Sequence, residues 1–155
     1  MPWRLETQVR GRITGPRCAY ATTVEVAYPL RESSREYYKD GVPRITSRVL
    51  IPEPNLWDPI SPFLYLGKFE LWQSDQCCDQ AERTIHLEQI SLGTHGLRWN
   101  GKPLTLRGVA RDTDLECDAL ELRRAGYNSV VTSVAQNSHD IWEKAERLGL
   151  SLIHI

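Results

Sequence analysis

The spacing of apolar residues changes near residue 100, and this change constrains the fold more than any other feature of the chain. Before that point, short stretches rich in β-branched and aromatic residues alternate with turn residues, a pattern typical of β-strands. After it, apolar stretches alternate with segments of helical periodicity. The sequence therefore predicts two domains, residues 1–99 and residues 100–155.

The first domain is predicted to consist of antiparallel strands. The expected strands are residues 3–13, 19–28, 44–51, 63–72 and 82–90. Polar segments at 29–43 and 74–80 separate some of them and predict turns. Strands that recur with turn signals between them favour an immunoglobulin-like antiparallel β-sandwich, so the chain is expected to be mainly β.

The second domain begins with Asn100-Gly101, the strongest short hairpin signal that a sequence offers. A β-α-β-α-β pattern follows, with Gly126 and Gly149 ending the two helices. The expected elements are strand 104–109, helix 114–125, strand 128–134, a helix capped by Asn137 or Ser138, and strand 150–155. The nearly continuous apolar strands predict a parallel sheet covered by helices.

The last expected strand reaches Ile155, the final residue of the sequence. An apolar edge strand with unpaired backbone groups is a liability that natural folds avoid. Two alternatives follow. Either this segment docks on the sandwich and stays small, or the chain is the front of a longer protein.

Four sequence motifs after residue 54 carry a resemblance. They are NLWDPISPFLY at 55–65, LRWNGKPLTLRGV at 97–109, AGYNSVVTS at 125–133 and AERLGL at 145–150. In this order and at these distances they resemble glycoside hydrolase family 2, the β-galactosidase, β-glucuronidase and β-mannosidase group. The resemblance covers residues 45–155, and the first 45 residues match only in their strand character.

The resemblance implies an architecture of a sugar-binding jelly roll, an immunoglobulin-like sandwich and a catalytic (β/α)8 barrel. This chain is expected to hold the sandwich and the first βα units of a TIM barrel, which in full takes roughly 250 residues. Retaining glycosidases use two carboxyl groups, one as acid/base and one as nucleophile. In the family both follow later barrel strands, beyond Ile155, so no catalytic residue is expected here and the chain alone is predicted to be inactive.

Arg107 and Asp112 are the candidate substrate-binding residues. In the family an arginine at the position of Arg107 lies under the floor of the active site and helps to hold carboxylates. The alternative is a buried structural arginine paired with Asp112 or Asp114. Asp112 follows the carboxyl end of a strand, where barrel enzymes carry their chemistry, and capping of the next helix is its alternative role.

The chain departs from the family pattern at several positions that contact sugar. Residues 110–113 (ARDT) replace a segment that usually contains a His-Glu pair. Val131 and Val134 stand where the family has arginine and histidine, and His154-Ile155 replaces an Asp-Glu pair. We therefore expect a sugar to be bound differently or not at all.

Composition excludes several classes of partner. Nineteen Lys and Arg against twenty Asp and Glu give a net charge of −1, which argues against nucleic acid. No segment is apolar enough to span a membrane, and no signal peptide begins the chain, so a cytoplasmic location is favoured. The four cysteines lack CxxC spacing, which predicts free thiols and no metal site, and no cofactor motif is present.

Two hypotheses for function follow. The first is a fragment or truncated relative of a family 2 β-glycosidase, whose partners are a carbohydrate and the remainder of a barrel or another subunit. The second is a non-catalytic accessory module that binds a partner protein or a glycan.

Overall fold

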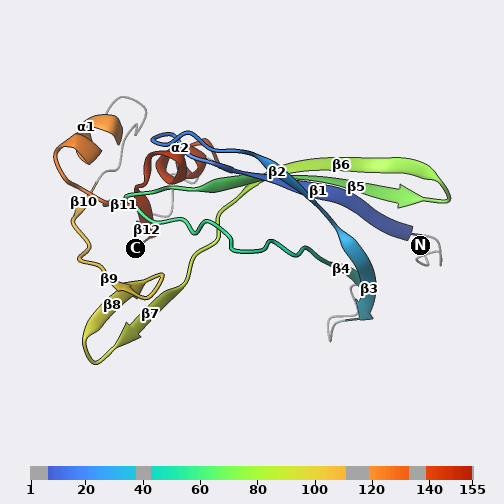
Figure 1. Cartoon of the computed structure of the whole chain (residues 1–155), viewed down its shortest axis with the longest axis horizontal. Helices are drawn as coiled ribbons and strands as arrows, with labels where there is room; N and C mark the ends of the chain where they lie inside the picture. Colours follow the sequence, from blue (N-terminus) through green and yellow to red (C-terminus); the bar gives the residue numbers. More distant parts are fainter. Residues whose placement is uncertain (1–6, 38–42, 111–118, 133–138, 155) are drawn as a thin grey trace. The chain divides into compact units, whose positions relative to one another are not determined.

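The computed structural model describes residues 7–37, 43–110, 119–132 and 139–154, and Figure 1 traces their elements in order. The chain divides into two compact units. Unit 1 comprises residues 1–16, 24–54 and 65–85, and unit 2 comprises residues 17–23, 55–64 and 86–155. The domain boundary at residue 99 stays a prediction.

Unit 1 holds most of the antiparallel strands. They are β1 (Thr7–Arg17), β2 (Val26–Pro29), β3 (Arg31–Tyr37), β4 (Pro43–Arg48), β5 (Leu64–Gln73) and β6 (Gln76–Ile85). One sheet has the order β2-β1-β5-β6, and β3 and β4 form a second, two-stranded sheet. Gly11 lets β1 approach β5 closely, since a Cβ there would collide with the carbonyl of Lys68. The predicted antiparallel pairing is confirmed.

Unit 2 contains a smaller antiparallel sheet built around the predicted hairpin. Its strands are β7 (Ile90–Gly93), β8 (Gly96–Trp99) and β9 (Lys102–Pro103), paired in that order. Asn100 and Gly101 both have positive φ, at 50° and 77°, the geometry that a two-residue hairpin turn requires. The Asn-Gly hairpin is therefore confirmed.

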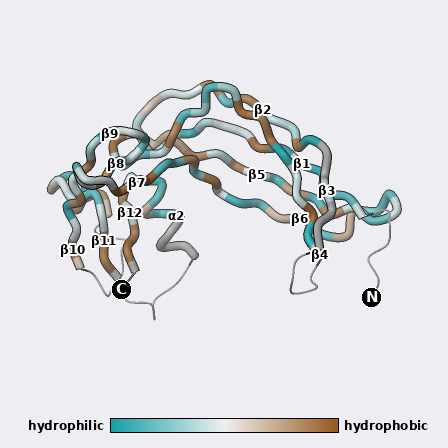
Figure 2. Tube along the Cα trace, turned by 90° about the horizontal axis from the view of Figure 1, so that it is seen from below, coloured by the Kyte–Doolittle hydropathy of each residue, from teal (hydrophilic) through white to brown (hydrophobic). Residues whose placement is uncertain are grey.

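The rest of unit 2 has the predicted β-α-β-α-β order. The elements are β10 (Gly108–Ala110), α1 (Ala119–Arg124), β11 (Ser129–Thr132), α2 (His139–Leu148) and β12 (Ser151–His154). The strands pair in parallel as β10-β11-β12, which confirms the predicted parallel sheet. Much of β11 and β12 is brown in Figure 2, the colour of hydrophobic residues.

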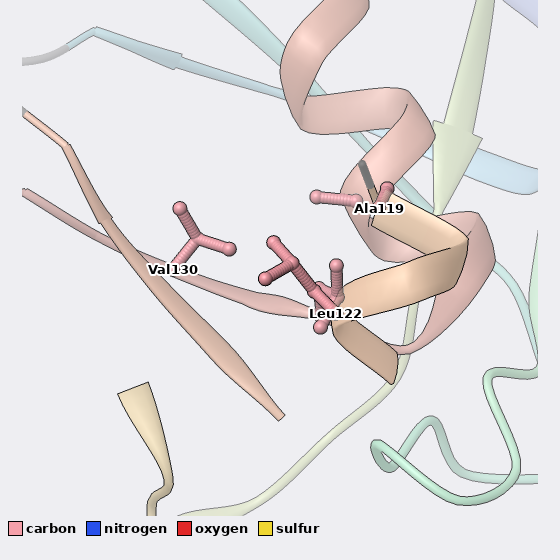
Figure 3. Close-up of a cluster of buried hydrophobic side chains, with 5 residues drawn as sticks. Ala119, Leu122 and Val130 are labelled. Atoms are coloured by element: carbon pink, nitrogen blue, oxygen red, sulfur yellow. The ribbon is translucent and has the colours of Figure 1, made fainter. Parts of the chain in front are cut away.

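Both helices pack against one face of this parallel sheet. Leu122 of α1 points toward Val130 of β11 in Figure 3, beside Ala119. Ala145 and Leu150 complete this buried cluster, and Val109, Leu148 and Leu152 pack against it. Because side chains alternate along a strand, residues next to Val109, Val130 and Leu152 face the other side of the sheet.

Glycines end both helices, as predicted. Tyr127 N–H donates to the carbonyl of Leu122 and Gly126 N–H to that of Arg123. The same pattern ends α2, where Leu150 N–H donates to Ala145 and Gly149 N–H to Glu146. These paired bonds are Schellman motifs, and they require the positive φ found at Gly126 (88°) and Gly149 (74°).

Several predicted boundaries are wrong. Residues 19–25 are not a strand, because Tyr20 is drawn into contacts with Arg123 and with the carbonyl of Leu148. The polar segments 29–43 and 74–80 contain β3 and the first half of β6, respectively, since exposed strand positions tolerate polar residues. Residues 104–107 also lie outside any strand.

Neither helix in the described part of the chain combines the length and apolarity that a membrane span needs.

Candidate functional site

The carboxyl ends of β10, β11 and β12 meet at one edge of the parallel sheet. Their last residues are Ala110, Thr132 and His154, and Thr132 pairs with His154 in the register of β11 and β12. In α/β barrels this is the edge that carries catalytic residues. Asp112, predicted to bind substrate, would follow β10 there, but it lies outside the described residues, as does Asp114.

Arg107 lies at the opposite edge, immediately before the amino end of β10. Its side chain is exposed, so the predicted alternative of a buried arginine is wrong. Its Nε donates a 2.6 Å hydrogen bond to the carbonyl of Gly126, just after α1. This contact fixes the loop between α1 and β11, and a substrate-binding role for Arg107 stays a prediction.

Asn128 joins the entrances of β10 and β11, a role that the sequence analysis did not assign to it. It is only 6% exposed. Its Oδ1 accepts from Arg107 N–H at 2.7 Å, and its Nδ2 donates to the carbonyl of Thr105 at 2.9 Å. The main-chain N–H of Asn128 donates to the carbonyl of Arg107, and its carbonyl accepts from Ser151 N–H. Asn128 therefore links the amino ends of β10, β11 and β12. The sequence signal for this role is an asparagine immediately before an apolar strand, here β11.

We predict that Asn128→Ala lowers the free energy of unfolding of unit 2 by about 2–3 kcal/mol, because a main-chain N–H and a carbonyl lose their partners. Urea denaturation followed by tryptophan fluorescence measures this change. Thr105→Ala is the control, since it keeps the accepting main-chain carbonyl and removes an exposed side chain. A loss below about 0.5 kcal/mol for Asn128→Ala contradicts the prediction.

Two tryptophans form the centre of a second cluster in unit 2. Trp57 and Trp99 are 3% and 5% exposed, and their rings lie 5.3 Å apart with Leu64 and Leu104 packed around them. Because both rings are buried, they pack within the protein and offer no face to a sugar. The aromatic-rich string at 55–65 therefore contributes to the core through Trp57.

Hydrogen bonds tie Trp57 to three separate segments. Its main-chain N–H donates to Leu87 at 2.7 Å, and its carbonyl accepts from Asn100 Nδ2 at 2.8 Å and Trp99 Nε1 at 3.2 Å. Its indole Nε1 donates to the carbonyl of Glu146, in the last turn of α2, at 2.8 Å. The carbonyl of Glu146 therefore accepts two hydrogen bonds at the end of α2, one from Gly149 N–H and one from the Trp57 indole.

His86 lies beside Trp57 and contacts two carboxylates. Its Nδ1 is 3.4 Å from Glu146 Oε2 and its Nε2 is 3.4 Å from Glu88 Oε1. The Trp57 and His86 ring centres are 5.8 Å apart. The hydrogen bond with Glu146 raises the pKa of His86 above 6.5. Burial raises the pKa of Glu88 above 4.5, and the neighbouring His86 opposes that rise.

Glu88 and Glu146 do not form a glycosidase acid/base and nucleophile pair. A retaining glycosidase holds a sugar between two carboxyl groups roughly 5–5.5 Å apart. Here an imidazole lies between the carboxylates, with one ring nitrogen 3.4 Å from an oxygen of each. This cluster is therefore suited to holding segments together, and no sequence pattern pointed to His86.

Arg123 makes a further connection that the sequence analysis missed. Its guanidinium donates to the carbonyls of Pro59, Ile60 at 3.1 Å and Gly149 at 3.4 Å. It also stacks over the ring of Tyr20 at 4.4 Å. A basic residue at the end of α1 suits the helix dipole, but these long-range contacts could not be read from its position.

No group of three or more His, Cys, Asp or Glu within the described ranges is placed to bind a metal ion. Cys18, Cys77 and Cys78 are free, and Cys117 lies outside these ranges.

The chain is similar to known glycoside hydrolases over most of its length. It is 26% identical over 122 residues to a β-galactosidase of Klebsiella pneumoniae, covering 71% of this chain and 12% of that protein. It is 25% identical over 138 residues to β-galactosidase BoGH2A of Bacteroides ovatus, covering 81% of this chain and 16% of that protein. No family model matches the chain.

Solved structures show the same fold. A β-glucuronidase of Bifidobacterium dentium complexed with coumarin-3-O-glucuronide matches with a TM-score of 0.66 and 17% identity, over 96% of this chain and 24% of that one. The chain thus spans less than a quarter of the length of these proteins. From the shared sequence over most of its residues, the chain is a relative of the family 2 glycoside hydrolases, the group of β-galactosidases and β-glucuronidases.

Proposed function

We propose that this chain is part of a family 2 β-glycosidase that hydrolyses O-glycosidic bonds. In this proposal residues 1–99 form the immunoglobulin-like sandwich, and residues 100–155 form the first two βα units and the third strand of the catalytic (β/α)8 barrel. The observation that carries it is the parallel sheet β10-β11-β12, in which strand order follows chain order and both helices cover one face. Successive strands of a barrel follow this order.

The face of the parallel sheet opposite the helices supports this proposal. By strand alternation that face carries Gly108, Ala110, Ser129, Val131, Ser151 and Ile153. The two branched residues among them, Val131 and Ile153, are of the kind that dominates the interior of a (β/α)8 barrel. The strands β10 and β12 are the two edges of the sheet, and closure of a barrel would pair both.

The chemistry would then depend on residues outside this chain. The two carboxylates of a retaining mechanism would come from later barrel strands, so residues 1–155 would act as scaffold and would be inactive by themselves. Arg107 and Asp112 remain the candidates for contact with a carbohydrate substrate. The departures from the family at residues 131 and 134 indicate that any sugar contacts made by these two positions differ from those of the relatives.

We predict that the purified chain releases 4-nitrophenol from 4-nitrophenyl β-D-galactoside and β-D-glucuronide no faster than buffer does. The physical reason is that, in this proposal, both catalytic carboxylates come from later barrel strands outside residues 1–155. A spectrophotometric assay measures the rate. Turnover that Arg107→Lys or Asp112→Asn abolishes would contradict the prediction, whereas turnover insensitive to both would identify a contaminating enzyme.

The reading frame after codon 155 tests the larger proposal directly. An open frame with further barrel repeats and an Asn-Glu pair is the expected result. A stop codon there would contradict it and favour the alternative, a non-catalytic module that binds a partner protein or a glycan. Val131 and Val134, in place of the arginine and histidine of the family, favour that alternative.

A further inference from the structure

His86 lies where three parts of unit 2 meet. It belongs to the segment between β6 and β7, which also carries Glu88. Its ring lies beside Trp57, from the segment 55–64, and its Nδ1 reaches Glu146 in the last turn of α2. The His86 side chain thus contacts both the segment 55–64, through Trp57, and helix α2, through Glu146.

Two kinds of group surround the imidazole. The charged groups acting on it among the described residues are Glu146, on α2, and Glu88, on its own segment. The neighbouring segment 55–64 presents Trp57, and β8 presents Trp99, which lies near Glu88. Both aromatic side chains are buried and uncharged, so they exclude water from one side of the cluster and strengthen its electrostatic interactions.

The number of donors on the imidazole depends on its protonation. A carboxylate only accepts hydrogen bonds, and a neutral imidazole has a single N–H. Neutral His86 therefore satisfies Glu88 or Glu146 but not both. The imidazolium has an N–H on each nitrogen and can satisfy both carboxylates at once, and its charge is also favoured near the carboxyl end of α2.

We propose that His86 is a proton-operated latch that holds the carboxyl end of α2 to the segments carrying Trp57 and Glu88. A proton taken from solvent by the imidazole closes the latch through both carboxylates. Loss of that proton leaves one half-buried carboxylate without its donor and loosens α2. The latch does not depend on the proposed glycosidase function, because it needs only residues of this chain.

The sign of the pH dependence follows from the two titrating groups. The pKa of His86 is raised by Glu146, so the folded chain binds this proton more tightly than the unfolded chain does. The stabilisation is complete below the unfolded pKa of 6.5 and is lost as the pH rises through the higher, folded value. The pKa of Glu88 is raised by burial, so its contribution falls in the same direction, beginning near pH 4.5.

Amide hydrogen exchange of residues 143–148 of α2, corrected for intrinsic rates, tests the latch between pH 5.5 and pH 9. We expect their opening equilibrium to rise with pH, about tenfold for each pH unit that separates the folded and unfolded pKa values of His86. His86→Gln keeps a polar side chain without the charge and should make this opening independent of pH above 6. His95→Gln, at an exposed histidine in the β7–β8 turn, should leave the wild-type pH dependence unchanged.

Two further measurements test the latch if His86→Gln does not fold. Glu146→Gln should weaken the pH dependence while preserving the side-chain shape. An NMR titration of the wild-type imidazole should give a His86 pKa above 6.5. A His86 pKa at or below 6.5, or α2 opening with the same pH dependence in wild type and Glu146→Gln, would overturn the latch.

Discussion

Trp57→Ala is expected to lower the free energy of unfolding of unit 2 by about 3–5 kcal/mol, the usual cost of removing a buried tryptophan. The ring is 3% exposed and packs on Trp99, Leu64 and Leu104. Its removal also leaves the carbonyl of Glu146 without the indole N–H. Urea denaturation followed by far-ultraviolet circular dichroism measures the loss, because the signal does not depend on the deleted indole.

Two further variants separate the causes of this loss. Trp57→Phe keeps most of the buried surface but removes the 2.8 Å hydrogen bond to Glu146, so about 1 kcal/mol is expected. Leu92→Ala removes an apolar side chain that is 82% exposed, and its effect should stay within about 0.5 kcal/mol. If Trp57→Ala costs no more than Leu92→Ala, the cluster around Trp57 does not stabilise the fold.

Gly149→Ala should destabilise unit 2 by about 3–5 kcal/mol through two effects that add. The φ of 74° at the end of α2 lies in the left-handed region, where a Cβ costs about 1–2 kcal/mol. The new Cβ would also collide with the guanidinium of Arg123 and the carbonyl of Pro59. Displacing Arg123 removes charged hydrogen bonds, each contributing about 1.5–3 kcal/mol.

Gly126→Ala is a matched control, because Gly126 ends α1 in the same motif with a φ of 88°. A Cβ at Gly126 meets nothing within 4 Å, so only the backbone strain of about 1–2 kcal/mol is expected. Thermal unfolding of the two variants, compared at one pH, measures the difference between them. Equal losses at both glycines would show that the contact of Arg123 with Pro59 contributes nothing.

The elements that sequence predicted best are those set by local rules. Asn100-Gly101 specified a two-residue turn, and Gly126 and Gly149 specified helix ends, because these positions need positive φ regardless of what surrounds them. The apolar strands around Val130 and Leu152 likewise followed from their composition. Of the strand expected at 19–28, residues 26–28 lie in β2 and residues 19–25 do not form a strand. Tyr20 in the latter segment is held by distant residues, an effect that no local pattern contains.

The candidate site was predicted less well, because its contacts also join residues that are distant in sequence. Arg107 was identified by its motif, yet its partner is a main-chain carbonyl, that of Gly126, which carries no sequence signal. His86 and Glu146 lie sixty positions apart in sequence and meet only through folding. Asp112 lies outside the described residues, so its role remains a prediction.

Hydrogen bonds at the amino edge of the parallel sheet hold its strands and helices together. Asn128 bonds to main-chain groups of Thr105 and Arg107 before β10 and of Ser151 in β12, and Gly126 and Gly149 close the ends of α1 and α2 at the same edge. Of the described residues, Ala110, Thr132 and His154 at the carboxyl edge make none of these bonds. A change of residue at Ala110 or Thr132 can therefore be accommodated without loss of the bonds that hold the sheet.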